Sequence, residues 1–277
     1  MTTRNGRGQL VTVFGGSGFV GRHTVRALAR SGWRVRAAVR RPDLAGHLQP
    51  MGNVGQIHAV QANVRYPDSV AAAVQGADAV INLVGILAPT GRQSFDAVHL
   101  KGAEAVAKAS AQAGIPRLVH MSALGADPNS NSDYAKSKGR AEEAVLAAFP
   151  GAVIVRPSII FGPEDEFFNR FASMAASAPL LPLIGGGRTR FQPVFVGDVA
   201  EAIKNACAGA GTPGTAYELG GPETATFRQL LEQIRKWTDR HPGFMPVPFW
   251  MAKVLAILTW PLPNALRPMT LDQVRLL

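Results

Sequence analysis

The sequence contains a pair of side chains that could move a proton. Tyr134 and Lys138 are four residues apart, so on a helix both would point to the same face. An ammonium group beside a phenol favours the phenolate, which would lower the pKa of Tyr134 and make it a general acid or base near neutral pH. Lys138 could also hydrogen-bond the ribose of a nucleotide. Because this spacing also occurs by chance on helix surfaces, its meaning depends on the elements around it.

Ser122 precedes this pair and is the third candidate catalytic residue. It directly follows a predicted strand and could hydrogen-bond the carbonyl or hydroxyl of a substrate beside Tyr134. The alternative is a serine that only caps the end of the strand. We expect His99 and His120 to be structural, and because the sequence has no Cys/His cluster we expect no metal site.

A glycine-rich turn near the N-terminus has the spacing of a dinucleotide-binding loop. Gly15 would let the chain turn sharply off a strand, and Gly18 would let backbone N–H groups approach a pyrophosphate. Gly21 would let the following helix pack closely, with its positive N-terminal end facing the phosphates. A structural turn is the alternative, but a buried strand before the glycines and a helix after them favour the nucleotide. The residues expected to contact it are Gly15, Ser17, Gly18, Phe19, Val20 and Gly21.

The residues after the second predicted strand bear on the choice of nucleotide. An acidic residue at this place would bind the ribose 2′-hydroxyl of NAD, whereas the sequence has Arg40 and Arg41. Two guanidinium groups could bind a 2′-phosphate with charge-assisted hydrogen bonds. We therefore favour NADP(H) as the cofactor, and NAD(H) stays open as the alternative nucleotide. Both arginines could instead be solvated loop residues that contact no nucleotide.

Short apolar strands alternate with helical segments in the first half of the chain. This pattern predicts right-handed βαβ units and an α/β fold: a Rossmann-type, doubly wound parallel sheet over residues 1–156, with the ligand at the C-terminal ends of its strands. Strands are expected at Leu10–Phe14, Arg34–Val39, Ile57–Val60, Ala79–Val84, Arg117–Met121 and Val153–Val155, and helices at Arg22–Ser31, Asp68–Val74, Phe95–Ala113 and Tyr134–Ala148.

Residues 157–277 are richer in proline and predict a smaller α/β lobe, interleaved with the first, that serves the substrate or a docking partner. Helices are expected at Phe167–Ala178, Asp198–Cys207 and Thr226–Trp237, and a strand at Pro193–Val196. The apolar segment Phe249–Trp260 is too short to cross a bilayer. It is either a buried core helix, which we favour, or a helix lying on a membrane surface. The apolar end of the sequence leaves open whether it continues in a longer protein.

Composition narrows the classes of protein. The 277 residues are 47% hydrophobic, which is enough for a substantial core, and the single cysteine fits a reducing compartment. Lys and Arg exceed Asp and Glu by 29 − 19 = +10. Because the basic residues are scattered, we expect no nucleic-acid partner but an anionic cofactor, an anionic membrane surface or an acidic partner protein. No secretory signal is evident at the N-terminus, so we expect a cytoplasmic protein.

With these motifs together, the chain resembles an atypical or extended short-chain dehydrogenase/reductase of the NAD-dependent epimerase/dehydratase type. The matching segments are Gly15–Gly21, Tyr134 with Lys138, and Arg156–Pro163. Three further segments are similar to the nucleotide-binding accessory subunits of respiratory complex I and their bacterial relatives: Val80–Gly85, Gly162–Phe171 and Phe191–Ala200.

The resemblance implies further cofactor contacts at Asn63, Val64, Val84, Gly85 and Pro157, besides Tyr134 and Lys138. Two departures stand out. Ala123 occupies the place of the family's usual catalytic serine or threonine, which leaves Ser122 as the nearest hydroxyl. Asn63 stands where the family has an aspartate that contacts adenine, and an amide can still hydrogen-bond the adenine edge.

Three functions follow as hypotheses. The first is an NADP(H)-binding reductase, linked to respiratory complex I or quinone metabolism, that transfers hydride to a quinone- or lipid-like substrate. The second is a non-catalytic cofactor-binding subunit of a membrane respiratory complex. The third is a sugar-nucleotide epimerase or dehydratase. The first two predict a place at the inner face of the cytoplasmic membrane, or on the matrix side in a mitochondrion.

Overall fold

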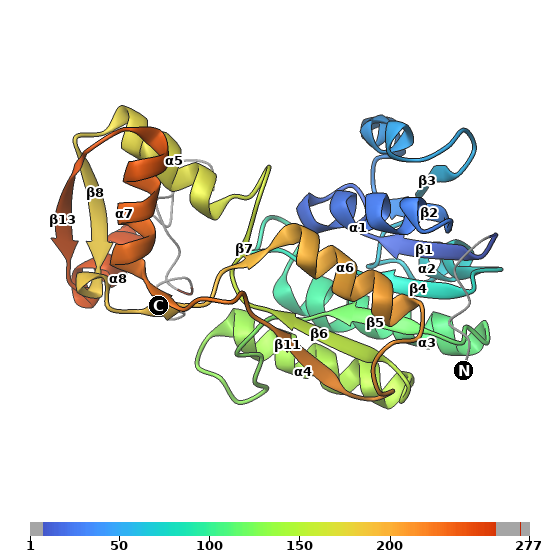
Figure 1. The fold of residues 1–277 in the computed structure, drawn as a ribbon. Helices are drawn as coiled ribbons and strands as arrows, with labels where there is room; N and C mark the ends of the chain where they lie inside the picture. Colours follow the sequence, from blue (N-terminus) through green and yellow to red (C-terminus); the bar gives the residue numbers. More distant parts are fainter. Residues whose placement is uncertain (1–7, 259–271, 273–277) are drawn as a thin grey trace. The chain divides into compact units, whose positions relative to one another are not determined.

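A computed structural model of the chain describes residues 8–258 and Asp272, which divide into two compact units (Figure 1). The first unit contains the chain up to Pro157 together with Val196–Leu219, and the second contains Ser158–Phe195 and the chain from Gly220 onward. We expected residues 157–277 to form a second lobe interleaved with the first. In the structure Val196–Leu219 is the segment that returns to the first unit, because its helix packs on α1 (Phe19–Arg30) and its strand extends the central sheet.

The first unit is built on a seven-stranded parallel sheet in the order β11-β6-β5-β4-β1-β2-β3. The order reverses between β1 and β4, which is where open α/β sheets bind their ligands. The predicted doubly wound fold is therefore confirmed. The strands are β1 (Leu10–Phe14), β2 (Arg34–Val39), β3 (Ile57–Gln61), β4 (Ala79–Asn82), β5 (Leu118–Met121), β6 (Val153–Pro157) and β11 (Ala216–Leu219).

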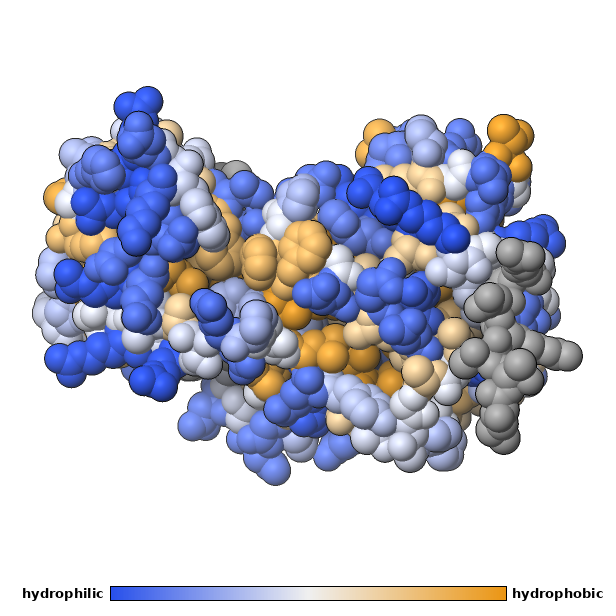
Figure 2. Space-filling model, in the orientation of Figure 1, coloured by the Kyte–Doolittle hydropathy of each residue, from blue (hydrophilic) through white to orange (hydrophobic). Residues whose placement is uncertain are grey.

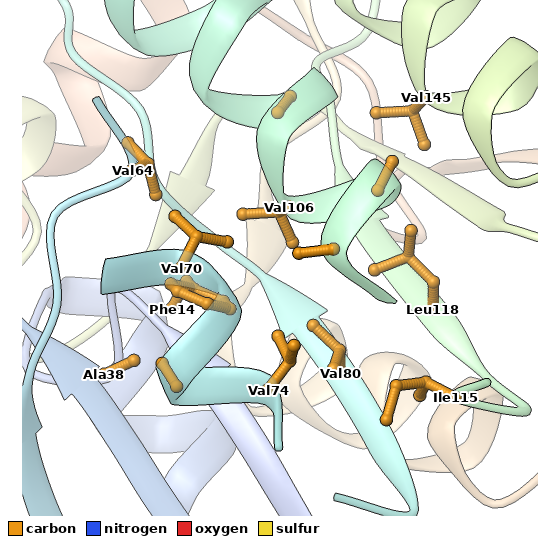
Figure 3. Close-up of a cluster of buried hydrophobic side chains, with 14 of the residues drawn as sticks. Phe14, Ala38, Val64, Val70, Val74, Val80, Val106, Ile115, Leu118 and Val145 are labelled. Atoms are coloured by element: carbon orange, nitrogen blue, oxygen red, sulfur yellow. The ribbon is translucent and has the colours of Figure 1, made fainter. Parts of the chain in front are cut away.

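Helices cover both faces of this sheet. Helices α1 and α6 (Val196–Cys207) pack together on one face, and α2 (Pro67–Val74), α3 (Lys101–Gln112) and α4 (Asp133–Ala148) cover the other (Figure 1). Figure 3 shows the core under the second group, where side chains from β1, β4 and β5 meet those of the three helices. Its members are apolar and buried, and include Phe14, Val70, Val80, Val106, Leu118 and Val145.

Several boundaries differ from prediction for local reasons. Strand β4 ends at Asn82 rather than Val84, because the Asn82 side chain accepts a hydrogen bond from the Val84 N–H and turns the chain away. Helix α1 begins at Phe19, directly after the glycine turn. The helix predicted over 95–113 has a π-helical turn, η3 (Asp96–Leu100), before α3. Short 3₁₀ turns, η1 (Pro42–Leu44) and η2 (Gly46–Met51), precede β3.

The second unit combines helices with short paired strands. Helices α5 (Phe167–Ser177) and α7 (Phe227–Thr238) share an aromatic and aliphatic core, while hydrophilic side chains cover the outer face of α7 (Figure 2). Thr226 caps α7 in a reciprocal capping box with Gln229. The strand pairs are β7 (Ile160–Phe161) with β10 (Val194–Phe195), β9 (Arg190–Phe191) with β12 (Ala225–Thr226), and β8 (Leu180–Ile184) with β13 (Gly243–Val247); η4 (Gly185–Gly187) follows β8.

The apolar helix α8 (Phe249–Leu258) is only partly a core helix. Ala252 and Ala256 are buried in the second unit's core, whereas Trp250 is 68% exposed and Val254 and Leu255 are also exposed. The expectation of a buried helix therefore holds for the alanine face alone. Trp260, the other tryptophan of the predicted segment, lies outside the described residues.

Candidate functional site

The glycine turn joins β1 to α1 at the switch point of the sheet. Gly15 has a φ of +78°, a conformation that favours glycine, and its N–H donates to the Ala38 carbonyl of β2 at 3.1 Å. A Cβ at Gly21 would lie 2.1 Å from the Gly15 oxygen. We expected Gly21 to be needed for packing of the helix on the sheet. In the structure it is the backbone of the turn itself, at Gly15 and Gly16, that leaves no room for a side chain at Gly21.

Gly18 is less tightly constrained than Gly15 and Gly21, because a Cβ there would make one close contact within the described chain, which a shift of a few tenths of an ångström relieves. Its φ of −74° suits any residue, and a Cβ there would meet only the Gly15 oxygen, at 3.3 Å. It is exposed and forms the N-cap of α1, where no side chain of the described residues caps the helix. Ser17, Phe19 and Val20 surround this N-terminus, whose N–H groups give it partial positive charge.

The two candidate phosphate ligands after β2 have different partners. Arg40 is exposed and donates to the Gln93 side chain at 2.5 Å. Arg41 forms a two-pronged ion pair with Asp43, at 2.7 Å for its closest atoms, and both side chains are more than half exposed. The Asp43 carboxylate neutralises part of the positive charge that the sequence indicates here.

After β3, the Asn63 side chain is turned onto its own loop. Its Oδ1 accepts from the backbone N–H of Arg65 at 3.2 Å, an Asx-type turn. Val64 is buried against Gly102 of α3, where a Cβ would come within 2.8 Å of its side chain. The Oδ1 atom of Asn63 is therefore engaged within its own loop, while Val64 is part of the core.

Lys138 lies at the C-terminal ends of β4 and β5. The side chain is only 3% exposed, and its ammonium group donates to the Met121 carbonyl at 3.2 Å. A Cβ at Gly85, in the loop after β4, would lie 3.5 Å from this nitrogen, so the loop backbone passes close to it. Burial lowers the pKa of Lys138 to about 8, and Glu142 acts in the opposite direction. Val84 is partly buried beside Gly85.

Tyr134 is on the same helix face as Lys138, as predicted, but its ionisation differs from prediction. The lysine nitrogen is 6.0 Å from the centre of the Tyr134 ring, and the ring also contacts Phe95 and His99 edge-on. Burial raises the pKa of Tyr134 to about 12, so the expected lowering by Lys138 is wrong for this structure. The phenol therefore keeps its proton at neutral pH.

The end of β5 buries two polar atoms that have no hydrogen-bond partner among the described residues, Ser122 Oγ and His120 Nε2. The other ring nitrogen of His120 lies 3.2 Å from the Asn82 amide nitrogen, which must donate to it. His120 Nε2 is then a donor in the neutral ring. Pro157, at the end of β6, is buried, and its carbonyl accepts from Leu124 N–H at 2.9 Å.

His99 and His120, which we expected to be structural, are both buried near Lys138. Burial, followed by the charge of Lys138, lowers the pKa of each histidine to about 3. The only cue in the sequence is that Phe95 and His99 share a helix face. The cluster of His99, His120 and Lys138 forms only in the folded chain, because its members are far apart in the sequence.

The arrangement can bind an elongated anion across the end of the sheet. Helix N–H groups and arginines lie toward β1 and β2, and a protonated phenol with a buried ammonium lies beside β4 and β5. Within residues 8–258 and Asp272, no group of three or more His, Cys, Asp or Glu is placed to hold a metal ion. No helix in that described part of the chain is long and apolar enough to cross a membrane.

The sequence matches two protein families. Residues 15–166 match a family described as NAD(P)H-binding. Residues 126–221 match the 3-beta hydroxysteroid dehydrogenase/isomerase family. The first match contains the glycine turn, both arginines and the Tyr134/Lys138 pair.

Individual relatives are similar over most of the chain. NADH dehydrogenase (ubiquinone) 1 alpha subcomplex subunit 9, mitochondrial, of Arabidopsis thaliana is 39% identical over 98% of this chain and 70% of its own length. Ceramide reductase of Caulobacter vibrioides is 35% identical over 72% of this chain and 61% of its own length. A dTDP-glucose 4,6-dehydratase from Streptomyces venezuelae, solved with NAD and TYD bound, shares the fold with a TM-score of 0.74 and 22% identity, covering 87% of this chain and 84% of that one.

Proposed function

This chain belongs to the NAD(P)H-binding short-chain dehydrogenase/reductase family, and we propose that it binds NADP(H) at the ends of β1 and β4 and reduces a carbonyl of a quinone- or lipid-like substrate. Gly18 carries the proposal. Its backbone conformation suits any residue, and its surroundings in the described chain disfavour a Cβ only mildly, through the Gly15 oxygen at 3.3 Å. A pyrophosphate on the N-terminus of α1 would require glycine more strongly, because a Cβ would stand between the phosphate and the helix N–H groups.

For the 2′-phosphate we propose Arg40 as the main ligand. Its guanidinium has five N–H groups, and only the bond to Gln93 engages it among the described residues. Arg41 would support it, but its pairing with Asp43 reduces its share. NAD(H) is the competing nucleotide, and it would need neither arginine.

The rest of the dinucleotide would lie along the sheet end toward β5. We propose that the Asn63 amide nitrogen contacts the adenine edge and that Lys138 contacts the ribose next to the nicotinamide. The unpaired buried atoms at the end of β5 support a fit to this group, because an oxygen-rich ligand can satisfy them. The remaining proposed contacts are Gly15, Ser17, Phe19, Val20, Gly21, Val64, Val84, Gly85, Tyr134 and Pro157.

The proton chemistry belongs to Tyr134, Lys138 and Ser122. The bound dinucleotide would supply the hydride. Tyr134 keeps its proton because burial raises its pKa, and it would donate that proton to the carbonyl oxygen as the alcohol forms. The Lys138 ammonium, whose nitrogen is 6.0 Å from the centre of the Tyr134 ring, would place a positive charge beside the phenolate left behind. Ser122 Oγ would give the reacting oxygen a second hydrogen bond.

The substrate and the location are proposed from the relatives and from α8. One relative is named as a subunit of NADH dehydrogenase (ubiquinone) and another as a ceramide reductase. We propose a peripheral place on a respiratory membrane, on its cytoplasmic or matrix side, in contact with subunits of the complex. The exposed apolar side chains of α8, with Lys253 between them, suit an anionic lipid surface.

The test begins with the nucleotide that the purified protein retains. We expect NADPH or NADP⁺ to be released on denaturation, and we expect added quinones or long-chain ketones, in separate arms, to oxidise the bound NADPH. Retained NADPH that neither substrate oxidises would favour a structural subunit. Conversion of a sugar nucleotide without net oxidation would favour an epimerase. Binding to anionic vesicles at low salt and release at high salt would support the membrane location.

A further inference from the structure

The buried His99 links three parts of the first unit. Its Nε2 accepts the backbone N–H of Ile86 at 2.9 Å, and its Nδ1 is 2.8 Å from Ser137 Oγ. Ser137 in turn donates to the Tyr134 carbonyl at 2.7 Å. Since the serine's single hydrogen is used there, its oxygen must accept from His99 Nδ1–H. The ring therefore has one fixed tautomer.

The neighbours of His99 hold this tautomer in place. The ring is 2% exposed on the π-helical turn η3, stacks on Phe95 at 5.2 Å and meets Tyr134 edge-on at 5.5 Å. A second proton on Nε2 would face the Ile86 N–H. Burial, followed by the nearby charge of Lys138, lowers the pKa of His99 to about 3. His99 is therefore neutral over the physiological range.

This ring stands between the loop after β4 and the helix that bears the proton-transfer pair. A Cβ on Gly85 would be 3.7 Å from His99 Nε2 and 3.5 Å from Lys138 Nζ. The bond to Ile86 fixes the loop on one side, and the bond to Ser137 fixes α4 on the other. His99 is thus hydrogen-bonded to both the loop and the helix.

We propose that His99 is a positioning residue that sets the gap between the Gly85–Ile86 backbone and the Tyr134/Lys138 face of α4, so that the gap fits the nicotinamide end of the dinucleotide. This inference rests on the proposed function. His99 itself touches no reacting atom. Its effect is confined to the nicotinamide half, because the phosphate and adenine contacts lie at the ends of β1, β2 and β3.

Two ligands separate this role from a purely structural one. NADPH engages the whole site, whereas 2′-phospho-ADP-ribose lacks the nicotinamide. We expect His99→Leu to weaken NADPH about tenfold, the effect of losing one or two hydrogen bonds, and to leave 2′-phospho-ADP-ribose unchanged. His99→Gln offers both an acceptor and a donor and should recover part of the loss.

Ser137→Ala provides a milder variant in case His99→Leu folds poorly, and it should weaken NADPH about threefold with the same selectivity. Ser110→Ala is its matched control, because Ser110 also donates to a carbonyl of its own helix but does not bond a histidine. Equal weakening of both ligands, or no weakening of either, would overturn the positioning role. A wild-type protein that binds neither ligand would overturn the proposed function and this inference with it.

Discussion

Alanine substitutions at Gly18 and Gly21 should affect the stability of the protein very differently, although both glycines belong to the same turn. In Gly21→Ala the new Cβ would stand 2.1 Å from the Gly15 oxygen and 2.8 Å from two Gly16 backbone atoms. Non-bonded carbon atoms normally lie about 3.5 Å or more from their neighbours. The turn and α1 would therefore have to separate by about an ångström, and no side-chain rotation can relieve contacts between backbone atoms.

Overpacking of this kind costs about 1–3 kcal/mol, and we expect the upper end here because every clashing atom is backbone. For a unit of this size the melting temperature falls by about 2–4 °C per kcal/mol, so Gly21→Ala should melt about 6–12 °C lower. In Gly18→Ala the nearest atom is 3.3 Å away and the φ of −74° suits alanine. Its melting temperature should fall by at most about 2–4 °C, because alanine restricts the unfolded chain and this offsets most of the weaker N-cap and of the close contact at 3.3 Å.

Nucleotide affinity should fall in Gly18→Ala even though its fold is nearly unchanged. Gly18→Ala places a methyl group where the pyrophosphate would lie, and the loss of one hydrogen bond to a charged group corresponds to about tenfold or more in NADPH affinity. Scanning calorimetry without ligand and NADPH titration by fluorescence measure the two effects. A Gly21→Ala variant that melts like the wild type would refute the steric argument. An undiminished affinity in Gly18→Ala would refute the phosphate site.

Three more predictions concern the charged and proton-bearing side chains. Arg40→Gln should lower the preference for NADPH over NADH in competition titrations more than Arg41→Gln does, because Asp43 already pairs with Arg41; equal effects would contradict this division. Tyr134→Phe should lose about 10²–10⁴ in the rate of ketone or quinone reduction and far less in NADPH affinity, and retention of the rate would remove Tyr134 from proton transfer. Lys138→Met should melt higher than the wild type at pH 7. The pKa of Lys138 is about 8 in the folded chain against 10.5 for a free lysine, so above pH 8 the unfolded chain binds more protons and the wild type gains stability as pH rises. The advantage of Lys138→Met should therefore shrink between pH 8 and 10, and a constant difference would contradict the lowered pKa.

The first unit could be predicted in large part because its signals are local. An apolar run followed by glycines predicts a strand and a turn, and Leu10–Phe14 and Arg34–Val39 are confirmed to the residue. The two lobes were expected to interleave, but strand β11 and the segment that returns, Val196–Leu219, were not identified, because their partners, β6 and α1, are far away in sequence. No local pattern specifies such a pairing.

The sequence predicted which side chains of the site share a helix face, but it did not predict how burial changes their pKa values. The four-residue interval placed Tyr134 and Lys138 on one face, and that interval is a property of any helix. The direction of the tyrosine's pKa shift depended on burial by Phe95 and His99, which come from another helix and were not assigned to the site. The hydrogen-bond partners of Arg41 and Asn63 could likewise not be predicted, because they depend on the direction in which each side chain points from its folded loop.

Lys138 gives the clearest physical reason to place a ligand here. A buried ammonium group is costly unless a carboxylate or several acceptors surround it. Its near carboxylate, Glu142, is already held by Arg156 through bonds of 2.6 and 2.9 Å. Among the described residues the Met121 carbonyl is the one acceptor that Lys138 has. The two histidines beside it are neutral donors or are already bonded, so they add no negative charge. Such a cost to stability is typical of a binding site, where oxygen atoms of a ligand complete the coordination that the protein leaves unfilled.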